Sequence, residues 1–96
     1  MGLNQKEVRV HAIISGRVQG VAYRWYTRDT AKELDVSGLV RNLADGNVEL
    51  VAEGPEEALK KLIDWCHKGP SMARVTSVVT KWEESKNEFN DFSIRH

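Results

Sequence analysis

The sequence of 96 residues has only one cysteine, no excess of either charge and no long apolar run. A single cysteine excludes an intramolecular disulfide, and the reducing cytoplasm is the expected compartment. The 14 basic and 14 acidic residues give a formal net charge of zero, which argues against a broad surface for nucleic acids or membranes. No apolar stretch approaches the roughly 20 residues of a membrane span, and the polar first residues do not resemble a signal peptide.

Metal-ligand spacing is missing as well. His11, His67 and His96 are scattered over a predicted strand, a helix end and the C-terminus, so we expect neither a metal site nor a cofactor. Cys66 falls on the apolar stripe of a predicted helix and is interpreted as a small core residue. The length, together with a hydrophobic share of 41%, predicts one folded domain over residues 1–96.

The spacing of apolar residues alternates between the periods of strands and of helices. Apolar residues at every second position from Val8 to Ile14 predict a strand with one buried face. Asp45-Gly46 predicts a hairpin turn, and Pro55 fits the first position of a helix. We predict strands at residues 6–15, 38–42, 47–53, 75–83 and 92–95, and helices at 22–34 and 55–68. This order is typical of an α+β, ferredoxin-like split β-α-β fold, an antiparallel sheet with two helices packed on one face.

The stretch from Gly16 to Arg24 has features that favour phosphate binding. Its sequence, Gly-Arg-Val-Gln-Gly-Val-Ala-Tyr-Arg, lies where a predicted strand passes into a predicted helix. The first turn of a helix carries unpaired N–H groups and a partial positive charge, and glycines let a loop turn its N–H groups inward. We expect the side chain of Arg24 to lean back over the loop and bind two phosphate oxygens. The residues alone leave a simple turn with a solvated arginine as the alternative.

Asn42 belongs to a second stretch of interest, which runs from Gly38 to Glu49. In the predicted fold the first two strands run in the same direction, with the third strand between them. Asn42 should therefore lie at the same edge of the sheet as the loop after the first strand. Its carboxamide can accept a proton from a water and donate to an oxygen at the same time. Taken alone, a strand-terminating asparagine before a turn is the simpler interpretation.

Together these two stretches resemble the acylphosphatase family. The first is similar to that family's signature Gly-Arg-Val-Gln-Gly-Val-x-Phe/Tyr-Arg, and the second to its Gly-x-Val-x-Asn-x-x-Asp-Gly-x-Val-Glu segment. The resemblance implies a metal-free hydrolase that splits acyl phosphates into a carboxylate and inorganic phosphate. It implies that Arg24 is the main phosphate ligand and that Asn42 positions the attacking water. The backbone amides implied to cradle the phosphate are those of Arg17, Val18, Gln19, Gly20 and Val21.

The same resemblance implies a small-molecule acyl phosphate as substrate, inorganic phosphate as a product inhibitor, and a monomer. No segment of the sequence predicts a dedicated pocket for the acyl group. Two alternatives come from other functional classes. RNA-recognition modules share the split fold, but they need aromatic residues within a basic motif that this sequence lacks. The second alternative is a domain that binds phosphate without turnover, because a fold alone never decides function.

Overall fold

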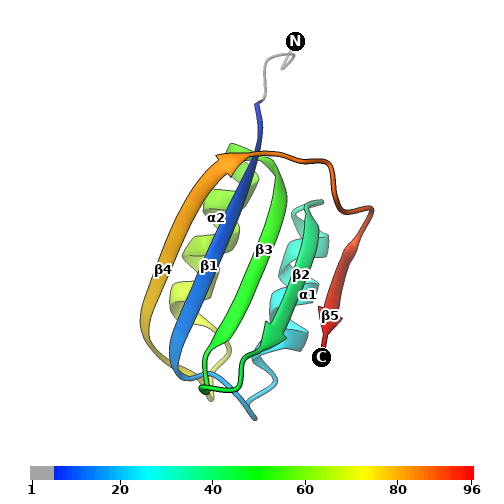
Figure 1. Ribbon diagram of the computed structural model, residues 1–96. Helices are drawn as coiled ribbons and strands as arrows, with labels where there is room; N and C mark the ends of the chain where they lie inside the picture. The colour runs from blue at the N-terminus through cyan, green and yellow to red at the C-terminus, as the bar shows by residue number, and fades with distance from the viewer. Residues whose placement is uncertain (1–5) are drawn as a thin grey trace.

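A computed structural model describes residues 6–96 and shows a five-stranded sheet with two helices against one of its faces (Figure 1). The strand order across the sheet is β4-β1-β3-β2-β5. This arrangement confirms the predicted ferredoxin-like α+β fold. The elements are β1 (Glu7–Arg17), α1 (Tyr23–Glu33), β2 (Ser37–Asn42), β3 (Val48–Pro55), α2 (Glu56–Lys68), β4 (Arg74–Glu84) and β5 (Phe92–Arg95).

The pairing of the strands departs from the prediction at one edge. β1 pairs antiparallel with β3 and β4, and β2 pairs antiparallel with β3. β5, however, pairs in parallel with β2, so the sheet is mixed. The prediction of a wholly antiparallel sheet was wrong here because a strand of four residues carries no sequence signal for its direction. The direction follows from the connection after β4, which crosses one end of the sheet before β5 begins (Figure 1).

The core lies between the sheet and the helices and follows the predicted periodicities. The inward positions of β1 and β3 are buried, and α2 buries Leu59, Leu62, Ile63 and Cys66. On α1 the buried positions are Tyr23, Thr27 and Ala31. The sequence predicts Pro55 at the first helical position of α2. In the structure Pro55 is instead the N-cap of that helix, with φ −60° and ψ 139°. The fixed φ of proline suits both positions, and the extended ψ keeps Pro55 in register with Glu7 at the end of β3.

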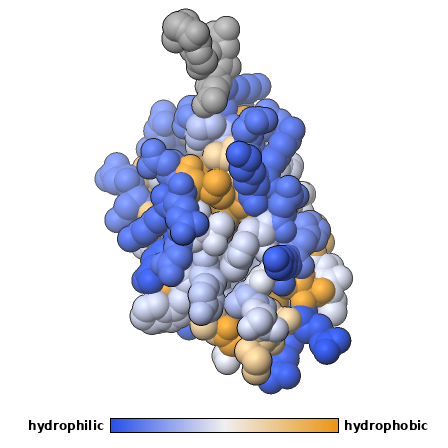
Figure 2. Space-filling view, turned by 180° about the vertical axis from the view of Figure 1, so that it is seen from behind, coloured by the Kyte–Doolittle hydropathy of each residue, from blue (hydrophilic) through white to orange (hydrophobic). Residues whose placement is uncertain are grey.

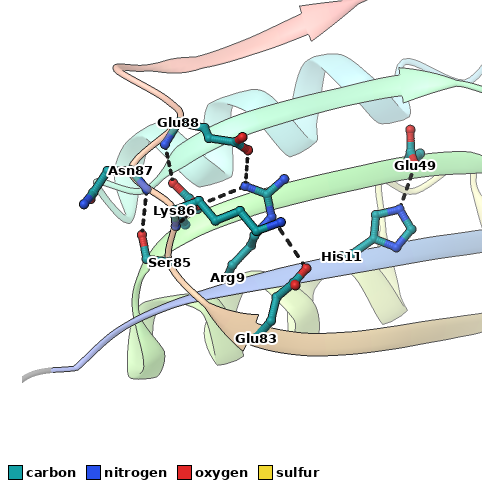
Figure 3. Close-up of polar contacts among 9 residues, drawn as sticks. Arg9, His11, Glu49, Glu83, Ser85, Lys86, Asn87 and Glu88 are labelled. Atoms are coloured by element: carbon teal, nitrogen blue, oxygen red, sulfur yellow. Dashed lines mark hydrogen bonds and ion pairs between the residues drawn. The ribbon is translucent and has the colours of Figure 1, made fainter.

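The connection between β4 and β5 is held to the sheet by a buried carboxylate, Glu53, whose side chain is only 3% exposed. Its oxygens accept hydrogen bonds from the backbone N–H of Lys86 at 2.7 Å and of Glu88 at 3.1 Å, and from Arg9 Nη1 at 2.9 Å. Arg9 also contacts Glu88 and Glu83 (Figure 3). Burial by itself would raise the pKa of Glu53, but the hydrogen bonds from Lys86, Arg9 and Glu88 outweigh it and lower that pKa.

The space-filling view of the helical side shows charged and polar residues over most of the surface, with one group of apolar residues above the middle and others near the lower end (Figure 2). That end carries the β1–α1 loop, the β2–β3 turn and the α2–β4 turn (Figure 1). The anchor made by Glu53 lies at the opposite end, because Glu53 pairs with Arg9 near the start of β1. In the described part of the chain, neither helix is long and apolar enough to cross a membrane.

Candidate active site

The loop between β1 and α1 has the backbone conformation that the glycines suggested. Gly16 has φ 120° and Gly20 has φ 75°, both in the region that side chains disfavour. A Cβ atom on Gly16 would lie 2.1 Å from the carbonyl oxygen of Arg74, so β1 and β4 approach each other too closely there for any other residue. Ala22, the N-cap of α1, is also left-handed with φ 62°. The loop therefore turns sharply back into the helix.

The amide groups of this loop and of the first helical turn have no hydrogen-bond acceptor among the described residues. Within residues 6–96, no N–H group of residues 18–22 donates a hydrogen bond to another protein atom. The first bond of α1 runs from Tyr26 N–H to the Ala22 carbonyl, and no side chain caps the helix. The first turn also contains no acidic residue. Unpaired N–H groups and the positive end of the helix dipole make this region suitable for an anion.

Arg24 and Asn42 meet in one pocket beside this loop, with a volume of about 330 Å³. Arg24 is half-buried and forms no ion pair with any residue of the described chain, so its guanidinium is available to a ligand. Its position in the first helical turn is the one predicted. The residues that line the pocket are Val18, Gly20, Ala22, Tyr23, Arg24, Trp25 and Asn42.

The sheet register brings Asn42 to the pocket. Val48 of β3 pairs with Ile14 of β1 on one side and with Asn42 of β2 on the other. The end of β2 and the end of β1 therefore lie at the same edge of the sheet, two strand spacings apart. The Oδ1 atom of Asn42 is buried and accepts no hydrogen bond from residues 6–96. A buried polar atom without a partner is costly in a folded protein, and here it belongs to a residue that lines the same pocket as Arg24.

Gln19 has a function in the loop that sequence reasoning missed. The prediction concerned only its backbone amide, but its side-chain Nε2 donates to the carbonyl oxygens of Leu43 at 2.8 Å and Asn47 at 2.9 Å. These two carbonyls belong to the turn that follows Asn42. The side chain thus joins the β1–α1 loop to the turn that follows Asn42. The sequence shows only a glutamine in a glycine-containing loop. A glutamine side chain has many possible hydrogen-bond partners, so its bonds to the turn after Asn42 could not be predicted.

The remaining predicted site residues lie around the loop in different environments. Val18 is buried in the core and also lines the pocket of Arg24. Arg17 and Val21 do not line the pocket of Arg24 but an adjacent one. A larger pocket of about 500 Å³ lies at the opposite end of the sheet, beside Glu53 and Asp35. Its acidic lining does not suit an anion, whereas the pocket of Arg24 does.

Comparison with known proteins identifies the family. The family model described as acylphosphatase matches residues 10–94. An acylphosphatase of Chloroflexus aurantiacus is 55% identical over 87 residues, which cover 91% of this chain and 95% of that protein. The chain belongs to the acylphosphatase family. The predicted enzyme class, an acylphosphatase, is thereby confirmed, and the RNA-binding alternative is wrong.

Solved acylphosphatase structures have the same fold as this chain. The crystal structure of acylphosphatase from Bacillus subtilis matches with a TM-score of 0.90 at 34% identity, covering 93% of this chain and 99% of that one. An acylphosphatase from Coxiella burnetii matches with a TM-score of 0.87 at 39% identity, covering 94% of each chain.

Proposed function

We propose that this acylphosphatase hydrolyses the carboxyl–phosphate bond of small acyl phosphates in the pocket between the β1–α1 loop and Asn42. The supporting observation is the convergence there of Arg24, which has no ion pair in the described chain, with unpaired loop amides and the Asn42 carboxamide. Arg24 binds two phosphoryl oxygens with its planar fork. The amides of residues 17–21 and of the first turn of α1 bind the phosphoryl group from the other side.

In the proposed reaction, Asn42 accepts a proton of one water in a hydrogen bond and so aligns the water oxygen with phosphorus. The new bond forms between that oxygen and phosphorus, and the bond between phosphorus and the acyl oxygen breaks. The electron pair leaves with the acyl oxygen as a carboxylate, and the water's proton passes to a phosphoryl oxygen of the substrate. Acyl phosphates have a good leaving group, so positioning and charge stabilisation supply most of the rate enhancement.

Three variants test these roles in the hydrolysis of benzoyl phosphate in the presence of a metal chelator. Arg24→Ala removes the main phosphoryl ligand, and we expect kcat/KM to fall by about 10²–10³-fold or more, with weaker inhibition by inorganic phosphate. Asn42→Ala should lower kcat while inhibition by phosphate stays near the wild-type value. Lys32→Ala, at the other end of the same helix, removes one positive charge as a control and should leave both values unchanged.

Wild-type turnover in Arg24→Ala would contradict the assignment of that residue. A folded wild-type protein that binds phosphate but does not turn over would favour the binding domain without catalysis. In water labelled with ¹⁸O, the label is expected in phosphate, whereas label in the carboxylate would place the attack at the acyl carbon. The proposal includes inorganic phosphate as a competing product, a monomeric enzyme and a cytoplasmic location, in keeping with the single cysteine, Cys66.

A further inference from the structure

A second pocket, of about 380 Å³, adjoins the proposed phosphate pocket. The two pockets share Gly20 and Ala22, so they lie next to each other along the same stretch of the β1–α1 loop. The lining of the second pocket is largely apolar. Besides the two shared residues, it is formed by Val21, Tyr26, Pro70 and Met72, together with Arg17 and Ser71.

Two large apolar side chains of this lining are exposed to solvent. Tyr26 is 53% exposed and Met72 is 65% exposed. Single exposed apolar residues are ordinary on protein surfaces, but here an aromatic ring and a thioether from separate elements line one hollow. Both side chains suit contact with an apolar ligand, because methionine adapts to the shape of a partner and packs well against aromatic rings.

The turn that carries Met72 is held in place by the core. Ala73 N–H donates to the Pro70 carbonyl at 2.9 Å, and Gly69 N–H donates to the Trp65 carbonyl at 2.7 Å. A Cβ atom at Gly69 would lie 2.9 Å from the ring of Tyr23, so the turn packs closely on the first residue of α1. Met72 is therefore presented to the loop by a fixed turn, and the pocket exists before any ligand binds.

We propose that this second pocket is the acyl subsite of the enzyme and that it selects acyl phosphates with a bulky apolar acyl group, such as an aryl group. The inference rests on the proposed function, because it takes the phosphoryl group to lie beside Arg24. The acyl group then extends across Gly20 and Ala22 and packs between Tyr26 and Met72. The neighbouring aromatic residue Trp25 is a weaker candidate, since the Arg28 guanidinium lies over its ring at 4.8 Å.

The charge of the lining agrees with this choice of ligand. Among residues 6–96, no acidic side chain lines the second pocket, and Arg17 is the one charged residue of its lining. An apolar acyl group of an anionic substrate meets no repulsion there, and a cationic acyl group would find no partner. The substrate class is thus anionic at the phosphoryl end and apolar at the acyl end.

The test compares two substrates that differ only in the acyl group, benzoyl phosphate and acetyl phosphate. In Tyr26→Ala and in Met72→Ala, the ratio of kcat/KM for benzoyl phosphate to that for acetyl phosphate should fall by about tenfold, the lower end of the range for apolar contacts in a pocket. The double variant should show a larger loss. Val79→Ala is the matched control, because Val79 is an apolar residue of β4 that is also 65% exposed, and its ratio should equal that of the wild type.

A second measurement avoids differences in chemical reactivity between the substrates. Calorimetry would compare the affinities of benzylphosphonate and methylphosphonate, and the preference for benzylphosphonate should fall in the same two variants. If both ratios match those of the wild type, the acyl subsite is not there and the inference is overturned. If neither acyl phosphate is hydrolysed by the wild type but the phosphonates bind with this preference, the proposed function fails while the apolar subsite stands.

Discussion

The buried carboxylate of Glu53 gives a prediction about stability that the structure makes quantitative. Glu53→Gln keeps the shape of the side chain but removes its charge and turns one acceptor into a donor. The side chain accepts three hydrogen bonds, two from backbone N–H groups and one from Arg9. The glutamine side chain can keep the hydrogen bonds that its one remaining oxygen accepts. Its NH₂ group must then face an N–H donor that the second carboxylate oxygen had accepted from. Hydrogen bonds to charged groups contribute about 1.5–3 kcal/mol each, and breaking a buried ion pair costs about 3–5 kcal/mol.

In this variant Arg9 still forms ion pairs with two other carboxylates, those of Glu83 and Glu88. The loss of folding free energy should therefore lie below the full cost of breaking a buried ion pair. We expect Glu53→Gln to lower the free energy of unfolding by about 2–4 kcal/mol at pH 7. For a domain of this size that corresponds to a fall in Tm of about 10–30 °C. Urea unfolding followed by tryptophan fluorescence measures the first quantity, and thermal unfolding the second.

The same carboxylate predicts how stability depends on pH. Because the pKa of Glu53 is lowered in the folded state, its contribution is complete above the unfolded pKa of about 4.3 and is lost as pH falls through the folded pKa. Stability of the wild type should therefore drop in this acid range more steeply than that of Glu53→Gln. Glu84→Gln, at an exposed position of the same sheet end, is the control. Equal losses in the two variants, within about 0.5 kcal/mol, would refute the reasoning.

Two further predictions concern the loop and the cysteine. Gln19→Glu replaces an amide that donates to the carbonyls of Leu43 and Asn47 by a carboxylate that can only accept. We therefore expect kcat to fall and the free energy of unfolding to drop by about 1–3 kcal/mol. Unchanged kcat and stability would contradict a positioning role for Gln19. Burial raises the pKa of the Cys66 thiol to about 12, so thiol reagents at pH 8 should react only after unfolding, and rapid labelling of the native enzyme would argue against this burial.

Sequence reasoning was most successful where a local pattern decides the outcome. The period of apolar residues, together with turn and helix-end signals, predicted the helices and strands, since burial of one face is the dominant stabilising interaction. The proximity of Arg24 and Asn42 was also predictable, because the order of elements fixes which strand ends share an edge. The family signature then added roles for these residues that their spacing alone did not contain.

The features that the sequence did not predict all depend on contacts between distant segments. The parallel pairing of β5, the side-chain bonds of Gln19 and the apolar pocket of Tyr26 and Met72 each join elements far apart in the chain. No sequence pattern predicts that a methionine in one turn lies beside a tyrosine on a separate helix. Only the packing of the α2–β4 turn on α1 brings the two side chains to one hollow.

The position of β3 between the two halves of the site has a consequence for dynamics. Val48 is paired with β1 on one side and β2 on the other, so a continuous ladder of backbone hydrogen bonds sets the distance between the end of β1, where the β1–α1 loop begins, and Asn42. Such a ladder opens only when the centre of the sheet unfolds. The ends of β1 and β2, from which the β1–α1 loop and Asn42 extend, therefore keep a fixed spacing as long as the centre of the sheet stays folded.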